Sequence, residues 1–287
     1  MKRLLIFCIV VCSLCINTNA QLLYEISGNG ITKSSYLFGT HHMIPIDKVV
    51  EIPGVFRAFN DCDAVISEFV DDNPEEMQRQ ILAASKMELS ILDLLNEEEE
   101  NLIDSALQAE LGLSLTNVQY MRPNVIAMIY EMTMYERIVA QKQDDMSIDS
   151  YFQVAATELG KAVYGLETLD KQLDILLRSV SLEQQAKNLI ETIRSADNIK
   201  QLNFSIDSAY TEGNIDLLYE LLLKEEEMTE AEKFLLVDER NLDWLSKIEM
   251  YIKSEPCFIA VGALHLPGKE GLINILRKTG YKVKEVK

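Results

Sequence analysis

The fold is decided near the C-terminus, where residues 257–265 read CFIAVGALH. Residues 257–261 are apolar on both faces, which is typical of a central strand in a sheet. Gly262 and His265 follow at once in a G-x-x-H motif, and Pro267 comes shortly after. This stretch therefore predicts an imidazole at the end of a buried strand, which is where open α/β sheets bind their ligands.

A second copy of the pattern lies near the N-terminus. Residues 35–38 predict a strand, GTHH follows at residues 39–42, and Pro45 comes next. In both copies a helical stretch and a further strand come after the motif, so the two units predict two related half-sheets that meet. The helix and second strand are expected at residues 53–60 and 64–68 in the first unit and at 269–279 and 281–286 in the second.

The middle of the chain has mainly helical patterns, with a strand predicted at residues 161–167. Asn73 before Pro74 is typical of a helix start, because asparagine caps the first turn and proline fits its first position. We therefore predict an α/β fold: a mixed central sheet built from two related half-sheets, with the helix-rich middle as an insertion or cap. The helical tracts are residues 73–160 and 169–253, with helices expected at about 123–141, 147–159, 169–180, 181–194, 197–210, 215–224 and 229–253.

The first twenty residues have the pattern of a secretory signal peptide. Lys2 and Arg3 form a basic head, residues 4–15 are largely apolar, and residues 18–20 offer a small-residue cleavage site. We predict cleavage after Ala20, export to the periplasm or the cell exterior, and no stable membrane insertion afterwards. A retained N-terminal anchor is the alternative. The mature chain, residues 21–287, is expected to form a single domain.

The chain is strongly acidic, with a formal net charge of −19. Such a protein repels phosphate backbones, so nucleic acid is excluded as a partner. Cys62 and Cys257 are the cysteines that remain after signal cleavage. An oxidising compartment would allow them to pair, whereas their apolar surroundings also suit buried free thiols.

Four ionisable side chains stand at the ends of predicted strands: His42, Glu68, Glu167 and His265. If these strands are parallel neighbours, the four groups converge. Two neutral imidazoles and a carboxylate are an ordinary ligand set for zinc and related divalent ions. We expect His42, His265 and Glu68 to bind a metal that activates a water, and Glu167 to support the ligands or act as the base.

The neighbours of these residues have supporting roles in this hypothesis. Gly39 and Gly262 allow a sharp turn or a close approach of two strands. Thr40 and His41 precede the first ligand, and His41 is expected to pack or hydrogen-bond because adjacent strand residues face opposite ways. The alternative is that both G-x-x-H histidines are only hydrogen-bonded polar groups at strand ends.

Further motifs lie between the two G-x-x-H copies. They are SE at residues 67–68, GLET at 165–168, YTEGN at 210–214 and ERN at 239–241. With YLFGTHH at 36–42 and VGALH at 261–265, this order resembles the TraB/GumN family, which includes the PrgY pheromone-shutdown proteins and the TIKI proteases that clip Wnt proteins.

The resemblance implies an α/β fold related to the erythromycin-esterase and ChaN-like proteins. It also implies a divalent-metal hydrolase, with zinc, manganese or cobalt as cofactor, that cleaves a peptide or protein substrate. By motif position, His42 and His265 are the paired histidines and Glu68 is their acidic partner. Arg240 is the family-like arginine, which would bind a substrate carboxylate, stabilise an oxyanion, or form a salt bridge.

Two other functions stay open at this point. One is a non-catalytic protein of the same fold that binds a metal, haem or a peptide, since a fold does not fix an activity. The other is an interaction protein whose acidic helical middle contacts a partner. The sequence also departs from its relatives around Pro123, which is flanked by Arg122 and Asn124 where relatives often have an aromatic residue.

Overall fold

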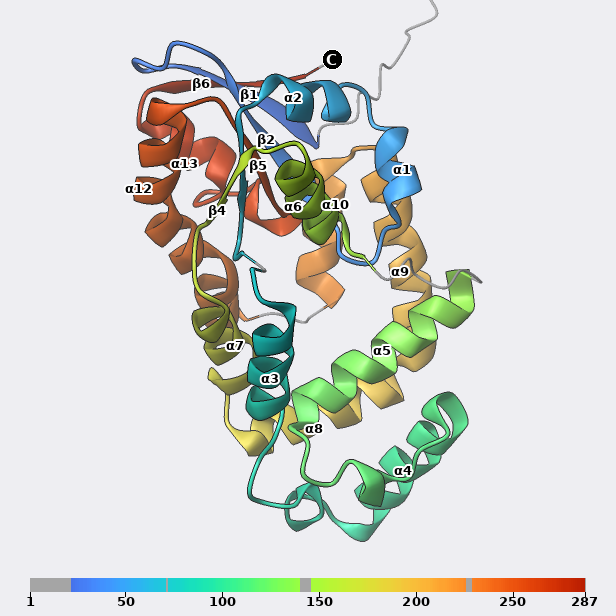
Figure 1. Cartoon of the computed structure of the whole chain (residues 1–287). Helices are drawn as coiled ribbons and strands as arrows, with labels where there is room; N and C mark the ends of the chain where they lie inside the picture. Colours follow the sequence, from blue (N-terminus) through green and yellow to red (C-terminus); the bar gives the residue numbers. More distant parts are fainter. Residues whose placement is uncertain (1–21, 71, 140–145, 226–228, 287) are drawn as a thin grey trace, which may run out of the picture.

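The computed structural model of the 287-residue chain describes residues 22–70, 72–139, 146–225 and 229–286. The predicted signal peptide, residues 1–20, lies outside these ranges. The described part consists of a sheet covered by helices and a helical region beside the sheet (Figure 1).

A six-stranded mixed sheet forms the centre of the protein, in the order β4-β3-β5-β2-β1-β6. The four strands β4, β3, β5 and β2 are parallel neighbours, whereas β1 pairs antiparallel with both β2 and β6. The prediction of an α/β fold with a mixed sheet is confirmed. The strands are β1 (Leu23–Gly28), β2 (Ser35–Thr40), β3 (Ala64–Ser67), β4 (Ala162–Gly165), β5 (Cys257–Gly262) and β6 (Tyr281–Glu285).

The apolar strand β5 lies inside the sheet, between β3 and β2, as its sequence indicates. Phe258, Ile259, Ala260 and Val261 are fully buried. Because β3 and β2 belong to one G-x-x-H unit and β5 to the other, the two units interleave within one sheet. An origin as two related half-sheets is therefore not confirmed.

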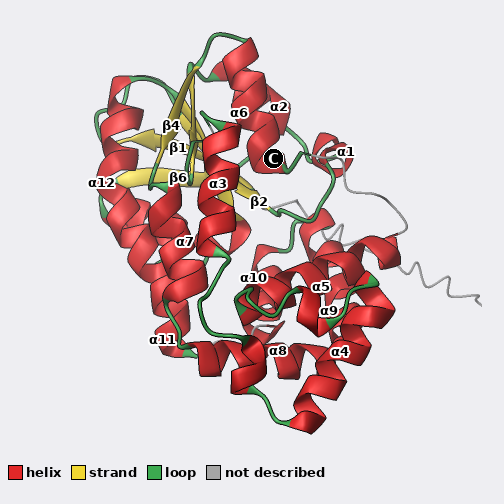
Figure 2. Cartoon of the chain, turned by 60° about the horizontal axis from the view of Figure 1, so that its bottom comes forward, coloured by secondary structure: helices red, strands yellow, loops and turns green. Residues whose placement is uncertain are grey.

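Helices cover both faces of the sheet (Figure 2). On one face α6 packs against β3, β4 and β5, and α2 packs against β2; on the other, α13 packs against β6 and α12. The helices beside the sheet are α1 (Ile46–Val50), α2 (Val55–Asp61), α6 (Ile148–Glu158), α12 (Glu239–Ser254) and α13 (Leu272–Lys278).

Most of the helical middle lies below the sheet in Figure 1. Its α4, α5 and α8 pack on one another around a second apolar core that includes Ile103, Leu107, Ile126 and Leu189. The elements of the middle are α3 (Pro74–Ala84), η1 (Ile91–Leu94), α4 (Glu97–Leu111), η2 (Leu115–Asn117), α5 (Pro123–Val139), α7 (Leu169–Arg178), α8 (Leu182–Arg194), α9 (Ala196–Thr211) and α10 (Ile215–Glu225).

The single helix predicted at residues 229–253 is interrupted. It consists of α11 (Glu230–Lys233), a π-helical turn η3 (Phe234–Asp238) and α12. Turns of this kind accommodate an extra residue in a helix and often occur at functional sites. Apolar spacing alone did not indicate the interruption, because Phe234 and Val237 continue the apolar pattern.

Two further findings concern the whole described chain. Cys62 and Cys257 are buried free thiols, so they do not form a disulfide. No helix among the described residues combines the length and the apolar character that a bilayer span requires.

Candidate functional site

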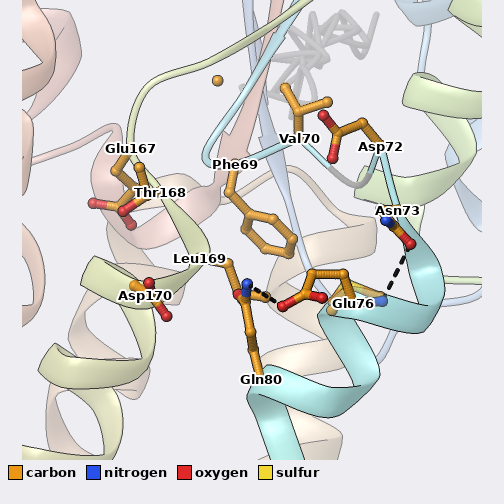
Figure 3. Close-up of a pocket in the computed structure, with 12 residues that line it drawn as sticks. Phe69, Val70, Asp72, Asn73, Glu76, Gln80, Glu167, Thr168, Leu169 and Asp170 are labelled. Carbon is orange, nitrogen blue, oxygen red and sulfur yellow. Dashed lines mark hydrogen bonds between the residues drawn. The ribbon is translucent and has the colours of Figure 1, made fainter.

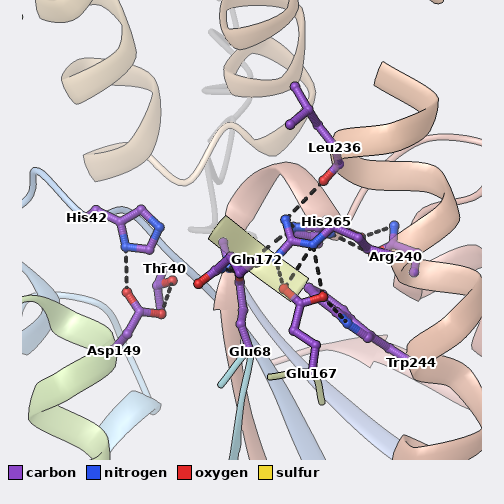
Figure 4. Close-up of polar contacts among 12 residues, drawn as sticks. Thr40, His42, Glu68, Asp149, Glu167, Gln172, Leu236, Arg240, Trp244 and His265 are labelled. Carbon is purple, nitrogen blue, oxygen red and sulfur yellow. Dashed lines mark hydrogen bonds and ion pairs between the residues drawn. The ribbon is translucent and has the colours of Figure 1, made fainter. Parts of the chain in front are cut away.

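The carboxyl ends of four neighbouring parallel strands meet at one edge of the sheet. His42 follows β2, Glu68 follows β3, and Glu167 comes just after β4. His265 closes the short 3-10 turn η4 (Ala263–His265), which follows β5. The structure thus places all four predicted residues along one edge, and three of them share a network of contacts (Figure 4).

Arg240 lies at the centre of this network. Its Nη2 donates to Glu68 Oε2 and to Glu167 Oε1, both at 2.6 Å, and its Nε donates to Glu167 Oε1 at 3.1 Å. All three side chains are buried, with 5 to 7% of their surface exposed. Burial alone would lower the pKa of Arg240, but the charges and hydrogen bonds of the two glutamates raise it. One guanidinium therefore forms ion pairs with two buried carboxylates and offsets one of their two negative charges.

The carboxylate of Glu68 has hydrogen-bond partners on both oxygens. Oε2 accepts from Arg240 and from Gln172 Nε2 at 2.8 Å, and Oε1 accepts from the backbone N–H of Gly262 at 2.9 Å. Burial would raise the pKa of Glu68, but His265, Arg240, His42 and the Gly262 N–H lower it to about 2. Glu68 is therefore an ionised carboxylate at neutral pH.

Glu167 is held from two directions. Besides the bonds from Arg240, its Oε2 accepts from the indole Nε1 of Trp244 at 3.2 Å. The Arg240 guanidinium also lies 4.7 Å from the centre of the Trp244 ring, a cation–π contact. Because both oxygens of Glu167 are already engaged, this arrangement favours a role in orienting Arg240 over a role as a free base.

The ring of His265 is fixed by Asn241. The Asn241 amide nitrogen donates to the backbone carbonyls of His265 and Glu270, at 3.1 and 2.9 Å, so its oxygen must face the ring. That oxygen lies 2.7 Å from His265 Nδ1, which therefore carries the proton. Burial lowers the pKa of His265 to about 3, against the opposing effect of Glu68. His265 is neutral, with the lone pair on Nε2.

The lone pair of His265 faces the charged groups of the network. Nε2 lies 3.2 Å from Arg240 Nη1 and 3.8 Å from Glu68 Oε1. A neutral imidazole nitrogen and an ionised carboxylate oxygen therefore stand side by side, with the guanidinium in contact with both.

His42 is held in a different way. Its Nδ1 lies 2.8 Å from Asp149 Oδ2, and 64% of its side chain is exposed. Nearby atoms that displace water lower the pKa of His42, but the hydrogen bond and charge of Asp149 and the charge of Glu68 raise it above its usual value. The charge of His42 in turn lowers the pKa of His265, so the two imidazoles lie within electrostatic reach of each other.

His41 and Gly39, within the first motif, contact the buried side chain of Tyr210. His41 Nδ1 accepts from the backbone N–H of Met43 at 3.2 Å, and its ring meets Tyr210 edge-on, with centroids 5.6 Å apart. Tyr210 is buried and its hydroxyl donates to the carbonyl of Gly39 at 3.0 Å. Burial lowers the pKa of His41 to about 4.

The two motif glycines lie where the strands approach closely. A Cβ added to Gly39 would lie 3.1 Å from the Cα of Ala263, and one added to Gly262 would lie 3.3 Å from Glu68 Oε1. The first glycine lets β2 approach the turn after β5, and the second lets a backbone N–H reach the carboxylate.

A model of the TraB/PrgY/gumN family matches residues 22–285. The chain belongs to this family. Neither a curated protein nor a solved structure matches the chain. The match begins at the first described strand and ends at the last, so the resemblance that the motifs indicate extends over the whole sheet and the helical middle.

Sequence reasoning missed several residues of this TraB-family site. Asn241 stands in the ERN motif next to Arg240, so its position was available from the sequence but its role was not. Asp149, Gln172 and Trp244 lie in helices, and Asp149 falls in a first turn, where acidic residues are common because they favour the positive helix end. Nothing in the local sequence distinguishes Asp149 from such a residue.

The donor set of the site suits a divalent ion, although the side chains do not form a closed cage. Among the described residues no three His, Cys, Asp or Glu side chains are arranged to hold a metal ion. Arg240 lies between the candidate ligands, since it contacts both Glu68 and His265. Neutral Nε2 of His265 beside ionised Glu68 is the chemistry a metal requires. Binding would require Arg240 to give up its contact with His265.

A cavity of about 290 Å³ adjoins this network, and Glu167 is part of its wall (Figure 3). The cavity lies between the loop after β3 and the first turns of α3 and α7. Apolar side chains of Phe69, Val70 and Leu169 line it together with the carboxylates of Asp72 and Asp170. It offers space for part of a ligand next to the buried charges.

Proposed function

We propose that this protein is an exported hydrolase that depends on a divalent metal ion and cleaves peptides or proteins by attack of a water. One observation carries the proposal: a neutral His265 Nε2 lies 3.8 Å from an ionised Glu68 oxygen at the sheet edge where both G-x-x-H strands end. Membership of the TraB/PrgY/gumN family supports it. The signal-peptide pattern supports export.

His42, Glu68 and His265 are the residues that would hold the ion, with zinc, manganese or cobalt as the proposed metals. When bound, such an ion lowers the pKa of a water toward about 7 and polarises the carbonyl under attack. The proposed relation of the fold to the erythromycin-esterase and ChaN-like proteins rests on the family resemblance.

Arg240 has the properties of a group that stabilises developing negative charge. It is buried, permanently charged and oriented by Glu167 and Trp244 before any substrate binds, so little reorganisation is needed during reaction. Its contact with Glu68 places it next to the proposed ligands. We propose that Arg240 binds the oxyanion or a substrate carboxylate, and that Glu167 holds Arg240 in position.

The cavity beside Glu167 provides room for a substrate group. Its apolar wall suits a side chain, and its carboxylates are Asp72, which precedes the cap of α3, and Asp170, in the first turn of α7. Glu167 lines this cavity and also contacts Arg240, so we propose that a side chain of a peptide substrate occupies it.

The proposal is tested with the mature chain, residues 21–287, stripped of metal and supplied with zinc, manganese or cobalt. A peptide library should be cleaved only with a metal present, and H265A should abolish both metal binding and cleavage. Asp174→Asn is the matched control, because Asp174 pairs with Arg178 at the surface. This variant should retain full turnover. Turnover by H265A in the presence of a chelator would show that the mechanism is wrong.

A non-catalytic binding protein is the second candidate, and a specific observation favours it. Arg240 already forms an ion pair with both Glu68 and Glu167, so neither carboxylate lacks a cationic partner, and the site could bind a metal, haem or a peptide without reacting. In that case the same experiment would give saturable binding of metal or peptide, or a haem Soret band, and no cleavage with any metal.

A further inference from the structure

We infer that Asp149 is a positioning residue that fixes the His42 ring so that Nε2 is the nitrogen available to the site. The inference rests on the proposed function, in which His42 is a metal ligand. Figure 4 shows Asp149 below the His42 ring and joined to it, with Glu68 to the right of both. Asp149 lies far from His42 in the sequence and is not part of any motif.

Both oxygens of the Asp149 carboxylate bind the loop that carries the first G-x-x-H motif. Oδ2 lies 2.8 Å from His42 Nδ1, and Oδ1 accepts from the Thr40 hydroxyl at 2.8 Å. Since a carboxylate only accepts hydrogen bonds, His42 Nδ1 must carry a proton. The two contacts fix both the ring and the strand end from which it projects.

The hydrogen bond matters because little else restrains the ring. The His42 side chain is 64% exposed, whereas that of Asp149 is only 14% exposed. An exposed ring samples several rotamers unless a specific contact selects one. The Asp149 carboxylate is the contact that selects the rotamer here.

Asp149 is itself held firmly. It lies in the first turn of α6, which is capped by the side chain of Ser147. The next turns bury Phe152 and Ala156 in the main core against the sheet. The orientation of His42 is therefore set by a rigid helix packed on a different part of the fold.

His265, the second motif histidine, is held by a hydrogen bond of the same kind. Asn241 on α12 accepts from His265 Nδ1 at 2.7 Å, as Asp149 on α6 accepts from His42 Nδ1. In both cases an oxygen on a helix binds Nδ1 and leaves Nε2 for the site. Partners of this kind are typical of metal-binding histidines, whose tautomer and orientation they fix.

The competing explanation is that Asp149 only stabilises the start of α6, as acidic residues in a first turn do. That role needs the charge but not the contacts with Thr40 and His42. The two roles are separated by the tautomer of His42, which helix stabilisation leaves unchanged.

The first experiment is nitrogen NMR of the histidine rings in the metal-free mature chain, at a pH where all rings are neutral. The chain has three histidines, so H42Q assigns the His42 signals. We expect the proton on Nδ1 in the wild type and on Nε2 in D149A. D149N should restore Nδ1–H, because its amide oxygen can still accept, and T40V should leave it unchanged. An Nδ1–H tautomer in D149A would overturn the inference, and D149L replaces D149A if the latter does not fold.

The second experiment is zinc titration against a competing chelator. D149A should bind zinc about 10- to 100-fold more weakly, the usual effect of removing such a partner, and D149N should recover most of the loss. If the wild type binds zinc and D149A binds it equally well, the inference is wrong and the proposed function stands. If the tautomer responds as expected but the wild type binds no zinc, manganese or cobalt, the proposed metal site is wrong and the positioning role stands.

Discussion

Replacing Arg240 with methionine tests the electrostatic core of the site. Methionine fills much of the volume of the arginine stem but removes the charge and every donor. Glu68 would keep its bonds from Gly262 and Gln172, and Glu167 would keep the bond from Trp244. Two buried carboxylates would nevertheless lose their shared cation. Removing one partner of a buried ion pair destabilises a protein by about 3–5 kcal/mol.

Protonation of Glu68 limits the part of this loss that comes from leaving its charge buried and unpaired. The reference pKa of a glutamate is 4.5, so neutralising Glu68 at pH 7 costs about 3.4 kcal/mol, at about 1.36 kcal/mol for each pH unit. At pH 5 the same step costs only about 0.7 kcal/mol. In R240M a buried, unpaired Glu68 would have a raised pKa, and the folded state would then bind more protons than the unfolded state. The stability of the variant should therefore fall as pH rises from 5 to 7.

The assay is urea unfolding followed by the fluorescence of Trp244, the only tryptophan of the chain. We expect R240M to lose about 3–4 kcal/mol at pH 7 and much less at pH 5, relative to the wild type at each pH. Arg178→Met is the matched control, since Arg178 forms an exposed pair with Asp174 and should lose no more than about 1 kcal/mol at either pH. A loss in R240M below about 1 kcal/mol, or one independent of pH, would refute the reasoning.

Two further outcomes follow from single contacts. Tyr210→Phe removes the donor to the buried carbonyl of Gly39 and should lower the free energy of unfolding by about 1–3 kcal/mol, measured by urea denaturation; an unchanged midpoint would mean that water replaces the hydroxyl. His265 has a pKa of about 3, below its reference value of 6.5, so the unfolded chain binds a proton that the buried ring does not. Stability should therefore fall as the pH falls below 6.5, by about 2 kcal/mol at pH 5 from this residue, and H265N should lack that component.

The sequence was sufficient to predict the strands and the edge at which the site lies. Apolar character on both faces placed residues 257–261 inside the sheet, and the repeated G-x-x-H spacing indicated the strand ends. These predictions depend on local periodicity and on the rule that parallel strands end at one edge. They do not depend on how distant helices pack.

What could not be predicted was which distant side chain meets each strand end. Arg240 was identified through the family motif, but its pairing with both Glu68 and Glu167 depends on the packing of α12 against the sheet. The π-helical turn before it, whose Leu236 carbonyl accepts from Arg240 Nη1 at 3.0 Å, has no periodic signal. Asp149 reaches His42 only because α6 packs beside β2. Such contacts follow from the tertiary fold, which no local pattern encodes.

The two motif histidines are equivalent in the sequence but not in the structure. His265 is buried and held by a neutral amide, which keeps it uncharged, whereas His42 is exposed to water and held by a carboxylate, which favours its protonated form. Environments that push the pKa values of two similar groups apart are how a site assigns them different tasks. His265 therefore presents a permanent lone pair next to Glu68, and His42 has to release a proton before its Nε2 can bind a cation. This difference predicts that the affinity for a divalent ion rises with pH, and that the rise is controlled by the Asp149–His42 pair and not by His265.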